Sequence, residues 1–147
     1  MINDLLLSSL TRFYEKDNNI YKFHKIINNS ELSLRLIDWF TTNYSKKYNI
    51  IYLVYRDAEG NKTIKPTDKI ISQFNVYNSY KSQLKAYSKK QFDPFCRRER
   101  INFTCNDYTF NTTLGQLNFF KWIITNNIFF SRCILESFFF PILQFCF

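Results

Sequence analysis

The chain has 147 residues, of which 46% are hydrophobic and 20% aromatic, and it contains only two glycines and three prolines. This length supports one domain with a substantial core, and the composition excludes a disordered or linker-rich chain. The formal net charge of +8 favours nucleic acid, an anionic membrane or an acidic protein as partner, because long-range attraction raises the rate of encounter.

The N-terminal third predicts three amphipathic helices. Apolar residues in 2–14 recur at helical spacing, and Asp17 with the two asparagines that follow it ends the first helix. A shorter helical pattern covers 20–27. A third covers 32–44, and Ser30 is its candidate N-terminal cap.

The middle of the chain predicts a β-hairpin followed by a long helix. Two stretches suited to strands flank turn-forming residues, which indicates a hairpin near 49–65. The polar stretch 66–73 is interpreted as a loop. A helix is expected from about Asn78, and it should stop near Pro94, because proline disfavours helical backbone in the residue before it.

The last predicted elements are a strand near 99–105 and a helix that ends at about Asn126. Thr113 and Gln116 fit the reciprocal capping pattern at the start of this helix. The expected fold class is α+β: a single domain over 1–127, mainly helical, with a small antiparallel sheet made from the hairpin and the strand.

The composition changes abruptly near the C-terminus. Residues 1–127 contain 16 Asn and 13 Lys, whereas 128–147 contain neither and hold seven Phe and two of the four Cys. Three interpretations stay open: an out-of-frame or truncated tail, a packed element with Arg132 paired to Glu136, and a membrane contact. A membrane span is disfavoured, because the uninterrupted stretch after Glu136 has 11 residues, against the roughly 20 that a helix needs.

The strongest functional signal is a basic aromatic segment at 77–103. Within 81–100, seven cationic side chains face only Asp93 and Glu99 and supply +5 of the net charge. Guanidinium forks suit phosphate oxygens, and lysines at four-residue spacing can follow a phosphate backbone. We therefore predict a nucleic-acid-binding surface made by the basic side chains of this segment: Lys81, Lys85, Lys89, Lys90, Arg97, Arg98 and Arg100.

The aromatic residues of the same segment have two alternative roles. Tyr77, Tyr80, Tyr87, Phe92 and Phe95 could stack on unpaired bases. Their helical periodicity instead favours core positions for most of them. The charged run has its own alternative as a solvated helix face.

No motif in the sequence names a reaction or a cofactor. His24, the only histidine, lies among apolar residues and is expected to be a structural imidazole. The spacing of Cys96, Cys105 and Cys133 matches no common zinc module. Asp93 is interpreted as a turn carboxylate that caps a backbone N–H or neutralises a guanidinium. We expect no enzymatic activity, no cofactor and no metal.

Four segments resemble one protein family: SLRLIDWF at 33–40, YKSQLKAY at 80–87, FDPFCRR at 92–98 and TLGQLNFF at 113–120. Together they are similar to a short uncharacterised protein family of nucleocytoplasmic large DNA viruses of the mimivirus type. The likeness runs over about 33–126. It implies a viral protein in the host cytoplasm or nucleus, or in the virion, that is not secreted, and it carries over no catalytic residue.

Two functions follow as predictions. The first is a non-enzymatic nucleic-acid-binding accessory protein of a large DNA virus, which contacts phosphates non-specifically through 77–103. The alternative is a protein–protein assembly module, whose basic surface meets an acidic viral protein and which has no nucleic-acid role. The sequence does not determine the oligomeric state.

Overall fold

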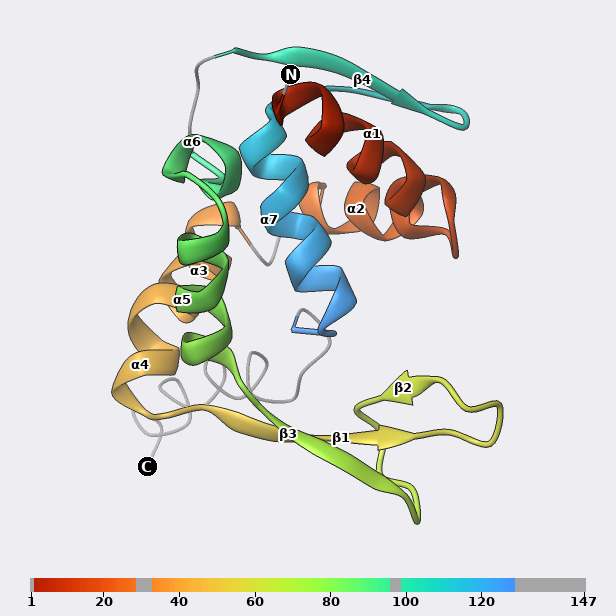
Figure 1. Ribbon diagram of the computed structural model, residues 1–147, viewed down its shortest axis with the longest axis vertical. Coiled ribbons are helices and arrows are strands. Elements are labelled where there is room, and N and C mark those ends of the chain that lie inside the picture. The colour runs from red at the N-terminus through yellow and green to blue at the C-terminus, as the bar shows by residue number, and fades with distance from the viewer. Residues whose placement is uncertain (1, 29–32, 96–98, 129–147) are drawn as a thin grey trace, which may run out of the picture. The chain divides into compact units, whose positions relative to one another are not determined.

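The computed structural model describes residues 2–28, 33–95 and 99–128 (Figure 1). The chain divides into two compact units, which we describe separately. Unit 1 takes the described residues within Met1–Leu34 and Gln83–Asn126, and unit 2 is built on Arg35–Ser82. The predicted α+β class, mainly helical with small antiparallel sheets, is confirmed. The expected single domain over 1–127 stays a prediction.

The core of unit 1 is built by three helices: α1 (Ile2–Glu15), α2 (Asn19–Ile27) and α7 (Leu114–Thr125). The chain reverses between α1 and α2 through Asp17 and Asn18, whose φ angles of 53° and 56° lie in the left-handed region that Asp and Asn tolerate. Phe23 of α2 is fully buried, with its ring centroid 5.5 Å from that of Tyr14 and 5.4 Å from that of Phe120. Aromatic packing therefore joins all three helices, and the two predicted N-terminal helices are confirmed.

Helix α7 lies beside α1 and α2 (Figure 1) and begins at a side-chain cap. The Thr113 hydroxyl accepts a hydrogen bond of 3.1 Å from the Gln116 backbone N–H, as predicted. The Gln116 side chain does not complete a reciprocal cap, because it accepts from the Thr112 hydroxyl. In the core, the Tyr14 hydroxyl donates to the Leu117 carbonyl at 2.6 Å, which satisfies a phenol that has no access to water.

Unit 1 also contains a two-stranded antiparallel sheet of β4 (Ile101–Cys105) and β5 (Tyr108–Thr112). The predicted strand near 99–105 is confirmed. The predicted single sheet is wrong, because β4 pairs with β5, which we did not predict, and not with the earlier hairpin. Asn106 explains the difference, since its φ of 52° allows a tight turn that makes the following segment the nearest partner.

Unit 2 begins with one helical stretch of three parts: α3 (Leu34–Trp39), a π-helical turn η1 (Phe40–Tyr44) and α4 (Ser45–Lys47). The predicted third helix is confirmed from Leu34 onward, and the helical stretch continues to Lys47. Its candidate cap, Ser30, lies outside the described residues. Around η1 the hydroxyls of Thr41, Thr42 and Ser45 each donate to the carbonyl four residues earlier. Such bonds bend helices and compete with the regular backbone ladder.

The sheet of unit 2 has the order β2-β1-β3, from β1 (Ile51–Arg56), β2 (Lys62–Thr63) and β3 (Ile70–Asn75). The predicted hairpin is confirmed, although β2 pairs with β1 at only two positions. The predicted loop at 66–73 is partly wrong, because β1 pairs mainly with β3. Residues 70–73 are all exposed, so this strand does not need the alternation of apolar and polar residues by which we recognise strands.

Helix α5 (Val76–Ala86) follows β3 with no connecting residue, and α6 (Lys89–Phe92) is a separate helix. The predicted continuous helix from Asn78 to Pro94 is therefore wrong. Ser88 has extended backbone (φ −67°, ψ 159°) and forms a capping box with Gln91, which starts a new helix at that point. Asp93 is extended before Pro94 (φ −80°, ψ 118°), as expected from the proline.

Candidate nucleic-acid interface

The predicted basic side chains lie on several elements. Lys81 and Lys85 are one turn apart on α5, whereas Lys89 and Lys90 belong to α6, so the lysines at four-residue spacing do not share one helix. All four side chains are exposed. Lys81 belongs to unit 2 and the other three belong to unit 1. Two further predicted residues, Arg97 and Arg98, lie outside the described residues.

Arg100 uses part of its guanidinium group within unit 1. Its Nε donates to the Asn111 side-chain oxygen, and its Nη2 donates to the Asn111 carbonyl at 2.7 Å. The Asn111 amide in turn donates to Asn102 at 3.1 Å. Arg100 thus links the residue before β4 to β5. We expect it to contribute less to phosphate binding than an arginine whose guanidinium group has no such partner.

Unit 2 brings together lysines and tyrosines from segments far apart in the sequence. The Lys46 Nζ lies 5.5 Å from the centroid of the Tyr77 ring, and the Lys81 Nζ lies 5.8 Å from it. The Lys47 Nζ lies 5.4 Å from the centroid of the Tyr48 ring. We call these five residues the lysine–tyrosine cluster. All three ammonium groups belong to exposed residues, so they are open to solvent and to phosphate.

The sequence identified only two of the five residues of this cluster. Tyr77 and Lys81 lie in the predicted segment, but Lys46 and Lys47 lie about thirty residues earlier and had no recognisable link to it. The link is made by folding, since the Val76 N–H donates to the Ile50 carbonyl at 3.1 Å where α5 begins. The available signal for Lys46 and Lys47 was that they form a basic pair just after the helical pattern at 32–44. This signal alone does not indicate a binding surface.

The aromatic residues of the predicted segment divide between core and surface. Phe92 is buried, and its ring centroid lies 5.6 Å from that of Phe119 and 5.9 Å from that of Trp122, which confirms a core role. Phe95 is 40% exposed. Tyr77 is half-buried beneath its two lysines. The core interpretation therefore holds for Phe92 but not for Phe95.

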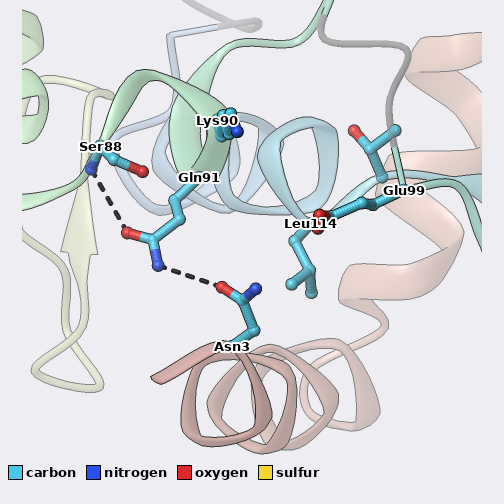
Figure 2. Close-up of a pocket in the computed structure, with 7 residues that line it drawn as sticks. Asn3, Ser88, Lys90, Gln91, Glu99 and Leu114 are labelled. Atoms are coloured by element: carbon cyan, nitrogen blue, oxygen red, sulfur yellow. Dashed lines mark hydrogen bonds between the residues drawn. The ribbon is translucent and has the colours of Figure 1, made fainter. Parts of the chain in front are cut away.

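A pocket of about 230 Å³ lies in unit 1, between the start of α1, helix α6 and the start of α7 (Figure 2). Gln91 extends toward Asn3 and donates to its side-chain oxygen at 3.2 Å, while accepting from the Ser88 N–H at 3.3 Å. Lys90 and Glu99 line the pocket with opposite charges. Its remaining lining is amide, hydroxyl and apolar, so the pocket offers no excess charge for an anion.

Three other residues with reactive side chains make local contacts or are buried. His24 is half-buried, its ring centroid 4.9 Å from that of Tyr108 and its Nδ1 3.1 Å from the Asn28 amide. Asp93 accepts from the Phe95 N–H at 2.9 Å, which confirms the predicted turn carboxylate. Burial, followed by the nearby charge of Glu15, raises the pKa of the Cys105 thiol. A raised pKa keeps this thiol protonated and unreactive.

Two predictions fall partly or wholly outside the described residues. Among 2–28, 33–95 and 99–128, no three His, Cys, Asp or Glu side chains gather closely enough to hold a metal ion; Cys96 and Cys133 lie outside these ranges. The tail with Arg132 and Glu136 is not described either, so its three interpretations stay predictions. In the described part of the chain, no helix has both the length and the apolar character that a bilayer crossing requires.

A model of a family of unknown function, DUF7197, matches residues 2–136. The chain belongs to this family. It is also 37% identical over 131 residues to the uncharacterized protein L507 of Acanthamoeba polyphaga mimivirus. That match covers 84% of this chain and 46% of the relative, so the chain spans about half the length of the viral protein. No solved structure matches the chain significantly.

These matches confirm the predicted resemblance to an uncharacterised family of giant viruses. They also extend it, because the family match begins at residue 2 and reaches residue 136, whereas the sequence suggested 33–126.

Proposed function

We propose that the chain is a non-enzymatic nucleic-acid-binding accessory protein of a large DNA virus, acting in the host cytoplasm or nucleus or in the virion. The observation that carries this proposal is the Tyr77 ring flanked by the ammonium groups of Lys46 and Lys81. Lys85, in the last turn of α5, is a further predicted phosphate contact. Exposed Lys89, Lys90 and Arg100, with Arg97 and Arg98 between them in sequence, supply the further predicted phosphate contacts.

The charge balance supports a polyanion as partner. Within 35–82, eight Lys and Arg face four Asp and Glu, and within 83–126 the predicted basic residues add to the excess. An exposed lysine that rests on a tyrosine ring gains only about 0.5–1 kcal/mol, so its ammonium group is readily redirected to a phosphate. Lysines contact phosphates as point charges, which predicts affinity without base specificity.

The salt dependence of binding tests this proposal. We expect the affinity for a labelled random 20-nucleotide DNA, measured by fluorescence anisotropy, to fall linearly with salt on a double logarithmic plot. Replacing Lys46 and Lys81 by Gln should weaken binding and reduce the slope by roughly one for each phosphate that the variant no longer neutralises. The matched control replaces Lys62 and Lys65 by Gln, because it removes the same charge from the β-hairpin of the same unit.

Two outcomes contradict the proposal. One is the absence of salt-dependent binding in the unaltered protein. The other is an equal loss in the variant and in its control, because that result indicates attraction to net charge rather than a binding surface.

A second candidate function is a non-enzymatic assembly module that binds an acidic viral protein. The sheet of unit 2 favours it, since Ile51, Ile70 and Ile71 are 43%, 62% and 38% exposed. A protein partner would remove this apolar surface from water. Retention of a viral partner after nuclease treatment, and its loss in an Ile70→Ser variant, would favour this function over the first.

A further inference from the structure

Three aromatic rings form a continuous row in unit 2. The centroid of the Trp39 ring lies 5.4 Å from that of Tyr44, and the Tyr44 centroid lies 4.6 Å from that of Tyr48. The two outer rings are partly open to solvent, because Trp39 is 43% exposed and Tyr48 is 56% exposed. We call this row the aromatic ladder.

The π-helical turn explains how the ladder forms. Residues five apart in an α-helix diverge by about 140° around the axis, so Trp39 and Tyr44 would point in different directions. In η1 the Ser45 N–H donates to the Phe40 carbonyl five residues earlier, which widens the turn and brings Tyr44 back to the face of Trp39. Tyr48 then follows at ordinary four-residue spacing. The backbone irregularity therefore brings three rings side by side, with neighbouring ring planes tilted by 51° and 42°.

Positive charge borders the ladder. Lys46 and Lys47 lie in the sequence between its second and third rings, and both side chains are exposed. The Lys47 ammonium group lies over the Tyr48 ring itself, 5.4 Å from its centroid. A purely structural aromatic cluster would bury its rings, because burial of aromatic area is its main stabilising effect. Exposed rings beside ammonium groups instead match a ligand that has both flat faces and negative charge.

We propose that the aromatic ladder is a stacking platform for the unpaired bases of single-stranded nucleic acid, whose phosphates are held by Lys46 and Lys47. This inference rests on the proposed function and names its substrate class. Every base offers a π-face, so stacking tolerates any sequence. Bases in a duplex are already stacked on one another and are not free to stack on the ladder, which makes the platform selective for single strands.

Removal of the rings without removal of charge tests the inference. We expect Trp39→Leu and Tyr48→Leu each to weaken binding of a 12-nucleotide oligothymidine by about 5- to 150-fold, the range that loss of one stacked base gives. The salt slope and the affinity for a duplex of the same length should change less than twofold. The oligothymidine should also quench the tryptophan fluorescence of the unaltered protein, and Trp39→Leu should abolish most of this quenching, because Trp122 is buried.

The matched control is Tyr21→Leu. Tyr21 is 44% exposed on α2, and the Lys25 ammonium group lies 5.4 Å from its ring centroid, so this pair reproduces the chemistry of Lys47 and Tyr48 without a ladder. We expect this control to leave single-strand affinity unchanged. Circular dichroism checks that each variant folds, and Tyr48→Leu, at the exposed end of the helical stretch, provides the test if Trp39→Leu does not fold.

The outcomes separate this inference from the function on which it rests. Salt-dependent binding of DNA that Trp39→Leu and Tyr48→Leu leave unchanged overturns the ladder and keeps the proposed function. Absence of binding to both single strands and duplex overturns both. If the ladder variants lose affinity for polyglutamate but not for oligothymidine, the ladder serves an acidic protein and the inference is wrong.

Discussion

Gly115 lies so close to the segment around Asp93 that a Cβ on the glycine would be 2.7 Å from the Asp93 carbonyl oxygen. The carbonyl oxygen of Lys90 would lie 2.8 Å from the same Cβ. Both atoms belong to the backbone and have little freedom to move. This close approach, with the hydrogen bond of 2.9 Å from the Asn118 amide to the Gln91 carbonyl, holds α6 against α7.

Gly115→Ala should therefore destabilise the protein by about 1–3 kcal/mol, as overpacking does. The sign of the change is informative, because the same substitution at an unobstructed helical glycine raises the free energy of unfolding by about 1 kcal/mol. Urea unfolding followed by circular dichroism measures the effect. Ser8→Ala on the exposed face of α1 is the control, with an expected change within about 0.5 kcal/mol. A stabilised Gly115→Ala variant would show that α6 does not pack as described.

Tyr14→Phe should reduce the free energy of unfolding by about 1 kcal/mol, because it removes the hydroxyl that donates to the Leu117 carbonyl in the core. The ring stays, so its packing against Phe23 and Phe103 is retained. Tyr21→Phe removes a hydroxyl from an exposed ring and should change stability by less than about 0.5 kcal/mol. Equal effects of the two substitutions would contradict a buried hydrogen bond.

The same tyrosine predicts how stability changes at alkaline pH. Burial raises the pKa of Tyr14 well above the ordinary value of 10.0. Above pH 10 the unfolded chain therefore releases a proton that the folded protein keeps, so stability falls as pH rises, by at most about 1.4 kcal/mol per pH unit. The raised pKa of Cys105 acts in the same direction, and the pKa of Lys121, lowered by burial, acts in the opposite one.

Comparison of the unaltered protein with Tyr14→Phe isolates the contribution of this phenol, because the other two groups are common to both. Between pH 9 and 11, urea titrations should show a smaller loss of stability in the variant. Parallel curves for the two proteins would show that Tyr14 ionises as easily in the folded state as in the unfolded chain.

Arg100→Gln should affect the β4–β5 hairpin more than nucleic-acid binding. The guanidinium group makes two hydrogen bonds to Asn111, and their loss from an exposed site should cost less than about 1 kcal/mol. Hydrogen exchange of the amides in 101–112 should accelerate. We expect Arg100→Gln to change the salt slope for DNA binding less than Lys85→Gln does, because Lys85 is an exposed lysine of the same predicted set. The reverse order would make Arg100 the stronger phosphate contact.

The sequence predicted elements with strong periodicity or local caps. The helices at 2–14 and 20–27 followed from apolar spacing, and the Thr113 cap followed from a short polar motif. Strand β3 was missed, because its partner β1 lies about twenty residues away and its own residues are exposed. Whether such a segment forms a strand depends on its pairing with a distant strand and not on local propensity.

The proposed binding surface was only partly predictable for the same reason. Lys81 and Tyr77 belong to a dense basic segment, whereas Lys46 reaches Tyr77 only after the chain has folded. The aromatic ladder was not predictable from periodicity, because Trp39 and Tyr44 are brought together by a π-helical turn that no α-helical pattern contains.

Because β3 continues directly into α5, the pairing of the sheet sets the position of Tyr77 and Lys81 in the lysine–tyrosine cluster. Asn75 ends the strand opposite Ile51, and Val76 begins the helix. A slip of one residue between β1 and β3 would turn every β3 side chain to the opposite face of the sheet. Helix α5 would rotate with its strand. Tyr77 would then no longer lie beside Lys46. The irregular pairing between Val54 and Tyr55 helps to set that register, so the pairing of β1 with β3 governs whether two distant parts of the sequence meet.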